Sequence, residues 1–77
     1  MDKNNLKPLR SLSELRELVA FAPEYQTIAI GAARDLGGRP SSWHDAIRLL
    51  EERAAKTSEG KVMQAVNHCI ASNKNHS

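Results

Sequence analysis

The segment from Ala32 to Glu51, AARDLGGRPSSWHDAIRLLE, constrains the fold of this 77-residue chain more than any other part. It combines a helix end made of small residues, a Gly-Gly turn and a capped amphipathic helix. Two helices that cross closely need Ala where they meet and Gly where the backbone leaves helical geometry. Ala33 and Gly37 stand where those demands fall. The segment therefore predicts a helix-turn-helix pair.

Helix signals also precede this pair. Ser11 and Glu14 form an S-x-x-E capping box, which predicts the start of a first helix. Its apolar residues recur at three- and four-residue steps, at Leu12, Leu15, Leu18, Val19 and Ala22. This helix should stop before Pro23, because proline disfavours helical geometry in the residue before it and suits the first turn of a new helix. The second helix is then predicted from about Pro23 to Leu36, with Gly37 as the residue that ends it.

Two more helices are predicted in the second half of the chain. Ser41 or Ser42 caps the third helix, whose apolar stripe holds Trp43, Ile47, Leu50 and Ala54. The fourth helix follows Thr57 or Ser58, with Val62, Met63, Val66, Cys69 and Ile70 on its apolar side. No strand pattern interrupts these segments. The fold class expected is all-α, a small bundle of four short helices that contains the helix-turn-helix-like pair.

The pattern divides the chain into three parts. Residues 1–10 are predicted to be a flexible basic arm, with Leu6 and Leu9 as its docking residues. Residues 11–72 form the single helical domain, and residues 73–77 a disordered polar tail. A domain this small buries only about 60% of the surface that its unfolded chain exposes, so its core is marginal. Support from a partner or a second subunit is therefore expected.

The charge is unevenly distributed. Eleven Lys and Arg against nine Asp and Glu give +2, and the first ten residues alone carry +2, from Lys3, Lys7 and Arg10 against Asp2. The body is nearly neutral, which is weak support for a nucleic-acid binder. The single cysteine excludes an intrachain disulfide and suits a reducing compartment. With no signal peptide and no apolar run of about 20 residues, a cytoplasmic location without membrane contact is expected.

No enzyme signature is present. His68 and Cys69 are adjacent, so on a helix they point about 100° apart and are poorly placed to bind one metal ion. Cys69 lies on an apolar stripe, where a small buried hydrophobe is the simpler interpretation than a nucleophile. We therefore expect no catalysis, no cofactor and no metal.

From Ala32 to Glu51 the chain resembles the helix-turn-helix of LysR-type transcription regulators. The resemblance rests on A-A-x-x-L, a short turn, a Ser-rich cap and I-x-x-L-E, that is Ala32, Ala33, Leu36, Ile47, Leu50 and Glu51. It implies that the start of the third helix enters the major groove of double-stranded DNA. The residues then available to phosphates and base edges are Arg39, Ser41, Ser42, His44 and Arg48. The arm residues Lys3, Lys7 and Arg10 would add salt-dependent contacts to the DNA backbone.

Two function classes stay open. The first is a small DNA-binding regulator. As a homodimer it would place two recognition helices on DNA and so read twice as much sequence. The second is a helical protein-interaction module, an adaptor or inhibitor of a larger protein without DNA binding. DNA binding requires Arg39, Arg48 and the arm on one side of the molecule, whereas an interaction module exposes apolar surface.

Overall fold

The chain folds into four helices, α1 (Leu12–Val19), α2 (Pro23–Asp35), α3 (Trp43–Lys56) and α4 (Glu59–Asn75). The structure, a computed structural model, describes residues 7–75, with side chains as far as Ser72. No strand is found within these residues. The prediction of a small all-α bundle of four helices is confirmed.

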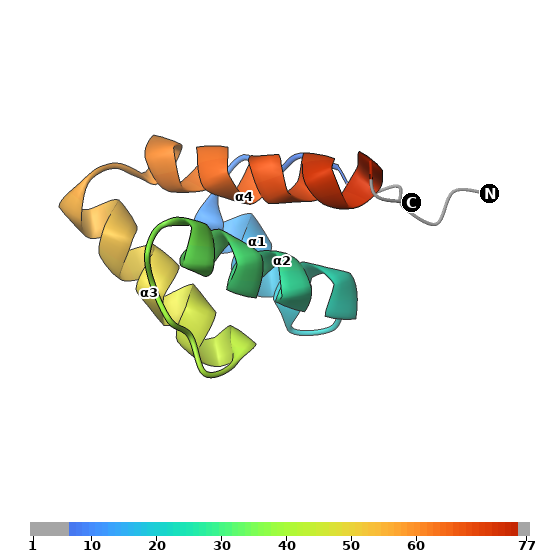
Figure 1. Ribbon diagram of the computed structural model, residues 1–77, viewed down its shortest axis with the longest axis horizontal. Helices are drawn as coiled ribbons and strands as arrows, with labels where there is room; N and C mark the ends of the chain where they lie inside the picture. Colours follow the sequence, from blue (N-terminus) through green and yellow to red (C-terminus); the bar gives the residue numbers. More distant parts are fainter. Residues whose placement is uncertain (1–6, 76–77) are drawn as a thin grey trace.

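Helix α2 occupies the centre of the bundle, since it packs against all three other helices. Figure 1 shows α4 along the long axis of the molecule with α2 below it, α3 inclined across one end, and α1 behind α2. Small residues allow this close packing. Ala29, Ala32 and Ala33 are at most 2% exposed. The prediction of close helix contact along this face of α2 is therefore confirmed.

The core is formed by apolar side chains from all four helices and from the segment before α1. Its members are Leu9, Leu12, Leu15, Val19, Tyr25, Ile28, Ala29, Ala32, Ala33, Ala46, Ile47, Leu50, Val62, Met63, Ala65, Val66 and Ile70. None of the described side chains buries a polar atom without a hydrogen-bond partner. Trp43, predicted to anchor the core, is only half-buried and packs against its edge, because it stands in the first turn of α3.

Helices α1 and α3 begin with the same arrangement. The Ser11 hydroxyl accepts from Glu14 N at 3.4 Å, and the Ser42 hydroxyl accepts from Asp45 N at 3.3 Å. Each acidic residue then accepts from the backbone N–H one position before the serine, Arg10 N for Glu14 and Ser41 N for Asp45. The predicted cap at Ser11 is confirmed, although the carboxylate of Glu14 bonds Arg10 N and not Ser11 N as in a standard capping box.

The boundary between α1 and α2 lies earlier than predicted. The apolar stripe continues to Ala22, but α1 ends at Val19. Ala22 is extended, with φ −120° and ψ 103°, and caps α2, which begins at Pro23. The ring of Pro23 excludes helical geometry at the preceding residue, so the last residues of the stripe form a corner.

Residues near both limits of the described range join the helical bundle. Leu9 is 7% exposed, and the side chain of Asn67 on α4 accepts from Leu9 N at 2.8 Å and donates to Leu9 O at 3.0 Å. Docking through Leu9 is thus confirmed, while Leu6 lies outside the described residues. Helix α4 continues to Asn75, beyond the predicted boundary at residue 72, since a polar last turn needs only its own backbone hydrogen bonds.

Candidate functional surfaces

The predicted DNA-contacting residues lie around the N-terminal end of α3, where a hydrogen-bond network centres on Asp45. Its carboxylate accepts from Ser41 N at 3.1 Å, and its own N–H donates to the Ser42 hydroxyl. Serine and aspartate satisfy N–H groups that a helix end leaves unpaired. Ser41 and Ser42 are both exposed. The Ser42 hydroxyl already caps α3, whereas Ser41 takes part only through its backbone N–H.

Arg48 is held by two carboxylates of its own helix. Its Nη2 and Nε donate to Asp45 Oδ1 at 2.6 and 3.1 Å, and its Nη1 donates to Glu52 Oε2 at 3.0 Å. The hydrogen bond from Arg48, followed by that from Ser41 N, lowers the pKa of Asp45. The same bond to Asp45 raises the pKa of Arg48. Three of the five N–H groups of this guanidinium are thus used within α3, and the two nearby carboxylates oppose the approach of a phosphate group.

Arg39 and His44 are the predicted residues that remain accessible at this end. Both are exposed, and no hydrogen bond or ion pair engages either side chain among the described residues. The His44 ring stacks on Trp43 with ring centroids 3.7 Å apart and planes 24° apart. The structure thus gathers Ser41, Ser42 and Arg48 around Asp45. Arg39 and His44 remain nearby without a hydrogen bond or ion pair among the described residues, although the His44 ring is stacked on Trp43.

The anchored part of the arm lies elsewhere. Lys7 and Arg10 are exposed and flank Leu9, which is bonded to α4 through Asn67. Figure 1 shows α4 along one side of the bundle and the start of α3 at the opposite side. This segment therefore begins away from the start of α3, and Lys3 lies outside the described residues.

The Gly-Gly turn has the geometry that the sequence indicates. Gly37 has φ +92°, the left-handed conformation that favours glycine. Gly37 N donates to Arg34 O at 2.9 Å and Gly38 N to Ala33 O at 2.8 Å, the two bonds of a Schellman motif. The connection from α2 to α3 covers residues 36–42, whereas the turn of a helix-turn-helix has about three or four residues.

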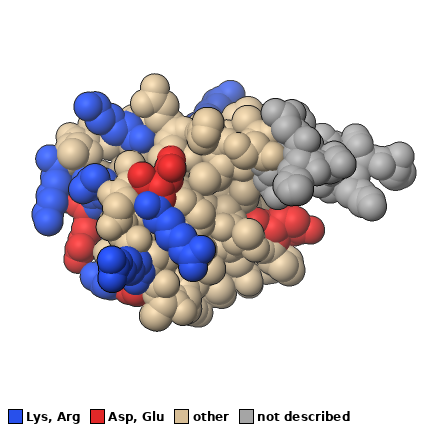
Figure 2. Space-filling view, viewed as in Figure 1, with Lys and Arg blue, Asp and Glu red and all other residues tan. Residues whose placement is uncertain are grey.

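Charged side chains gather at one end of the molecule. Figure 2 shows Lys and Arg side chains over α3 and the start of α4, with Asp and Glu between them. On the exposed face of α3, Arg16 of α1 pairs with Glu51 at 3.4 Å, and Arg48 pairs with Asp45 and Glu52. The acidic residues of this face thus pair with Arg16 and Arg48, which weakens the attraction of these two arginines for phosphate.

The sequence reasoning did not single out Phe21, which is 73% exposed. It is the only large apolar side chain exposed in the described part of the chain. Phe21 lies in the corner between α1 and α2, off the apolar stripe that predicted α1. An aromatic residue off the stripe, two positions before a helix-starting proline, was the signal that could have identified it.

The surroundings of Cys69 do not activate its thiol. Burial, and then the negative charge of Asp35, raise the pKa of the Cys69 thiol, which disfavours the nucleophilic thiolate. Among the residues described, no three His, Cys, Asp or Glu side chains are placed to hold a metal ion. Within the same range, no helix is both long enough and apolar enough for a membrane crossing.

Comparison of the chain with protein-family models, with curated proteins and with solved structures finds no match. Its function must therefore be inferred from its own residues.

Proposed function

We propose that this chain is a small helical protein-interaction module that binds a larger protein through Phe21. The observation that carries the proposal is the 73% exposure of this ring in a domain whose other large apolar side chains are buried or half-buried. Burying an exposed phenylalanine contributes about 2 kcal/mol, and aromatic residues are enriched in protein interfaces.

Single exposed apolar residues are common on monomers, so the rigidity of the corner is the second support. Phe21 N and Ala22 N both donate to Leu18 O, at 3.2 and 2.8 Å. Gln26 Nε2 on α2 donates to Val19 O at 2.8 Å and so ties the two helices together. A ring presented on a fixed backbone loses little conformational entropy on binding, which favours its use as an anchor.

A photo-crosslinking experiment tests this proposal. Phe21 is replaced by the photoreactive analogue benzoylphenylalanine in cells that express the chain, with the exposed α1 residue Glu17 replaced in the same way as the matched control. We expect one defined crosslinked product from position 21, suppressed by excess unlabelled parent protein but not by excess F21S. Equal products from both positions, or no product from position 21, would contradict an anchor role for Phe21.

DNA binding is the second candidate, supported by the exposed side chains of Arg39 and His44 beside the start of α3, neither of which forms a hydrogen bond or ion pair among the described residues. Fluorescence anisotropy with random duplex DNA at about 50 and 200 mM salt tests it. Binding that falls steeply with salt and is weakened by R39A supports this candidate. R34A is the matched control, since Arg34 is an exposed arginine outside the predicted set. Absence of binding at low salt excludes phosphate-driven recognition.

A further inference from the structure

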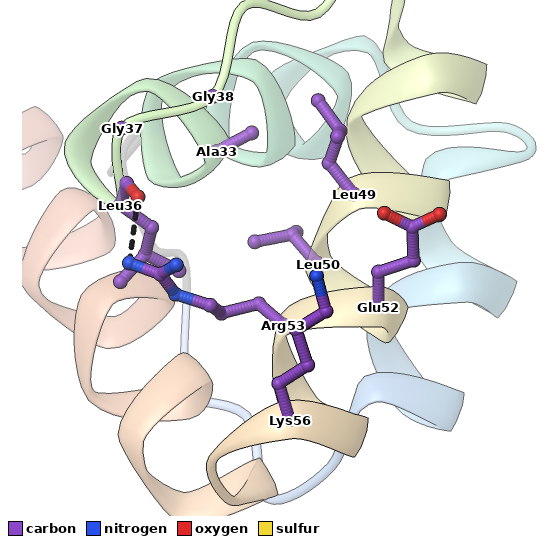
Figure 3. A pocket seen from close by; sticks show the side chains of 9 residues that line it. All are labelled: Ala33, Leu36, Gly37, Gly38, Leu49, Leu50, Glu52, Arg53 and Lys56. Atoms are coloured by element: carbon purple, nitrogen blue, oxygen red, sulfur yellow. Dashed lines mark hydrogen bonds between the residues drawn. The ribbon is translucent and has the colours of Figure 1, made fainter.

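A hollow of about 200 Å³ lies between the Gly-Gly turn and the second half of α3. Figure 3 shows Arg53 reaching from α3 to the turn, with Leu49, Leu50 and Ala33 around the space beside it. We call this space the Arg53 hollow. It is smaller than the roughly 300 to 1,000 Å³ of sites for drug-sized ligands, and its size matches a single side chain.

The turn leaves this space open because it carries no side chains. At Gly37 nothing lies within 4 Å of the place where a Cβ would stand. A Cβ on Gly38 would come within 3.1 Å of both Ala33 O and Leu49 Cδ1. The lining thus combines bare backbone with the half-buried aliphatic side chains of Leu36 and Leu49.

The charges at the rim are not balanced. Glu52 lines the hollow, but it is already paired with Arg48 at 3.0 Å. Arg53 and Lys56 form no ion pair within the described residues. They stand three positions apart on α3, so their side chains share one face of the helix. The rim therefore carries two cations and one carboxylate, and that carboxylate is already paired with Arg48.

The carbonyl groups that end α2 compensate only part of this positive charge, because Leu36 O alone accepts from Arg53 and other carbonyls of the last turn are bonded within it. Gly38 N donates to Ala33 O, Gly37 N to Arg34 O, and Arg53 Nη2 to Leu36 O at 2.9 Å. The last bond also fixes the guanidinium beside the hollow. Its other N–H groups have no partner in the described part of the chain and remain able to donate.

We propose that the Arg53 hollow binds a short segment of a partner protein in which an aliphatic side chain stands next to a carboxylate. The aliphatic side chain packs on Leu36 and Leu49, and the carboxylate binds Arg53 and Lys56. This inference rests on the proposed function only in taking the ligand to be a protein. The surface is a different one, since Phe21 precedes α2 and the hollow follows it, about 20 Å away along 13 residues of helix.

Titration of the ¹⁵N-labelled chain with the blocked dipeptide acetyl-Leu-Glu-amide, followed by amide chemical shifts, tests the proposal. We expect saturable shifts centred on Gly37, Gly38 and Arg53. The neutral dipeptide acetyl-Leu-Gln-amide should bind at least about threefold more weakly, the effect of one solvent-exposed ion pair.

Variants assign the binding to the rim. K56Q removes an exposed cation that forms no hydrogen bond or ion pair among the described residues, so it should weaken the binding of acetyl-Leu-Glu-amide about threefold. K61Q removes an exposed cation outside the hollow and should leave the binding unchanged. F21S should bind the dipeptide with the same affinity as the parent. The proposal for the Arg53 hollow and the proposal for Phe21 are therefore tested independently of each other. Shifts that never saturate, equal affinity for the two dipeptides, or equal affinity of K56Q and the parent each overturn the proposal.

Discussion

The side chain of Asn67 joins the segment before α1 to α4, and its removal should destabilise the domain measurably. N67A deletes the bonds to Leu9 N and Leu9 O, at 2.8 and 3.0 Å, and leaves both backbone groups half-buried without their partner. Two such hydrogen bonds contribute about 2 kcal/mol together. Alanine is the better helix former by up to about 0.7 kcal/mol, so we expect a net loss of about 1.5 kcal/mol.

That loss is large for a domain of this size. At about 0.05 to 0.15 kcal/mol per residue, the whole chain has a free energy of unfolding of about 4 to 12 kcal/mol. Urea denaturation followed by circular dichroism measures the difference. In thermal melts a loss of about 1.5 kcal/mol corresponds to a Tm lower by about 6 to 12 °C.

Two controls separate the hydrogen bonds from other effects. N67D keeps an acceptor for Leu9 N but loses the donor to Leu9 O, so its stability should fall between those of the parent and N67A, or below N67A if the carboxylate repels Leu9 O. Q64A changes an exposed residue of the same helix and should leave the stability within about 0.5 kcal/mol of the parent. If N67A also stays within about 0.5 kcal/mol, the attachment of Leu9 contributes nothing to stability and the reasoning is refuted.

Three further predictions concern the helix ends. G37A places a Cβ on a residue with φ +92° and should cost about 1 kcal/mol in urea denaturation, whereas G60A, in the exposed first turn of α4, should be neutral or stabilising. W43A should lower the free energy of unfolding by about 1 to 3 kcal/mol in the same assay, because Trp43 is only half-buried. Removal of a fully buried aromatic residue costs about 3 to 5 kcal/mol, and a loss of that size would contradict the position of Trp43 at the edge of the core. The folded state lowers the pKa of Asp45 through Arg48 and Ser41, so this carboxylate stabilises the fold at neutral pH and the stabilisation is lost as the pH falls below about 4. D45N should therefore flatten the acid limb of the stability profile, and an unchanged limb would contradict a role for this group.

The helices were predictable from the sequence because their signals are local. The sequence predicts a helix start at or next to each of Ser11, Ser42 and Ser58, and in the structure each of these serines caps the helix that follows it. Gly37 ends α2 as expected. Spacing at three and four residues also identified the buried faces of α2 and α4. The end of α1 was less predictable, because the apolar stripe runs past the point where Pro23 forces the chain to turn.

The surfaces were less predictable, because they depend on which side chains meet after folding. The resemblance implies that Arg48 is available to DNA, yet in the folded chain it lies between Asp45 and Glu52. Spacing at i,i+3 and i,i+4 favours such pairs on any helix, so this engagement was accessible to sequence reasoning. The Arg53 hollow was not, since it arises where the turn after α2 approaches a later part of α3.

The attachment of Leu9 to Asn67 also has a consequence for the order in which the molecule assembles. This contact joins residues 58 positions apart, whereas the bond between Arg53 and Leu36 spans 17 positions. Closing the longer loop costs about 1 kcal/mol more in chain entropy. We therefore expect the turn between α2 and α3 to form early and Leu9 to attach to Asn67 after the folding barrier. A variant that loosens the ends then unfolds faster while its folding rate stays nearly the same.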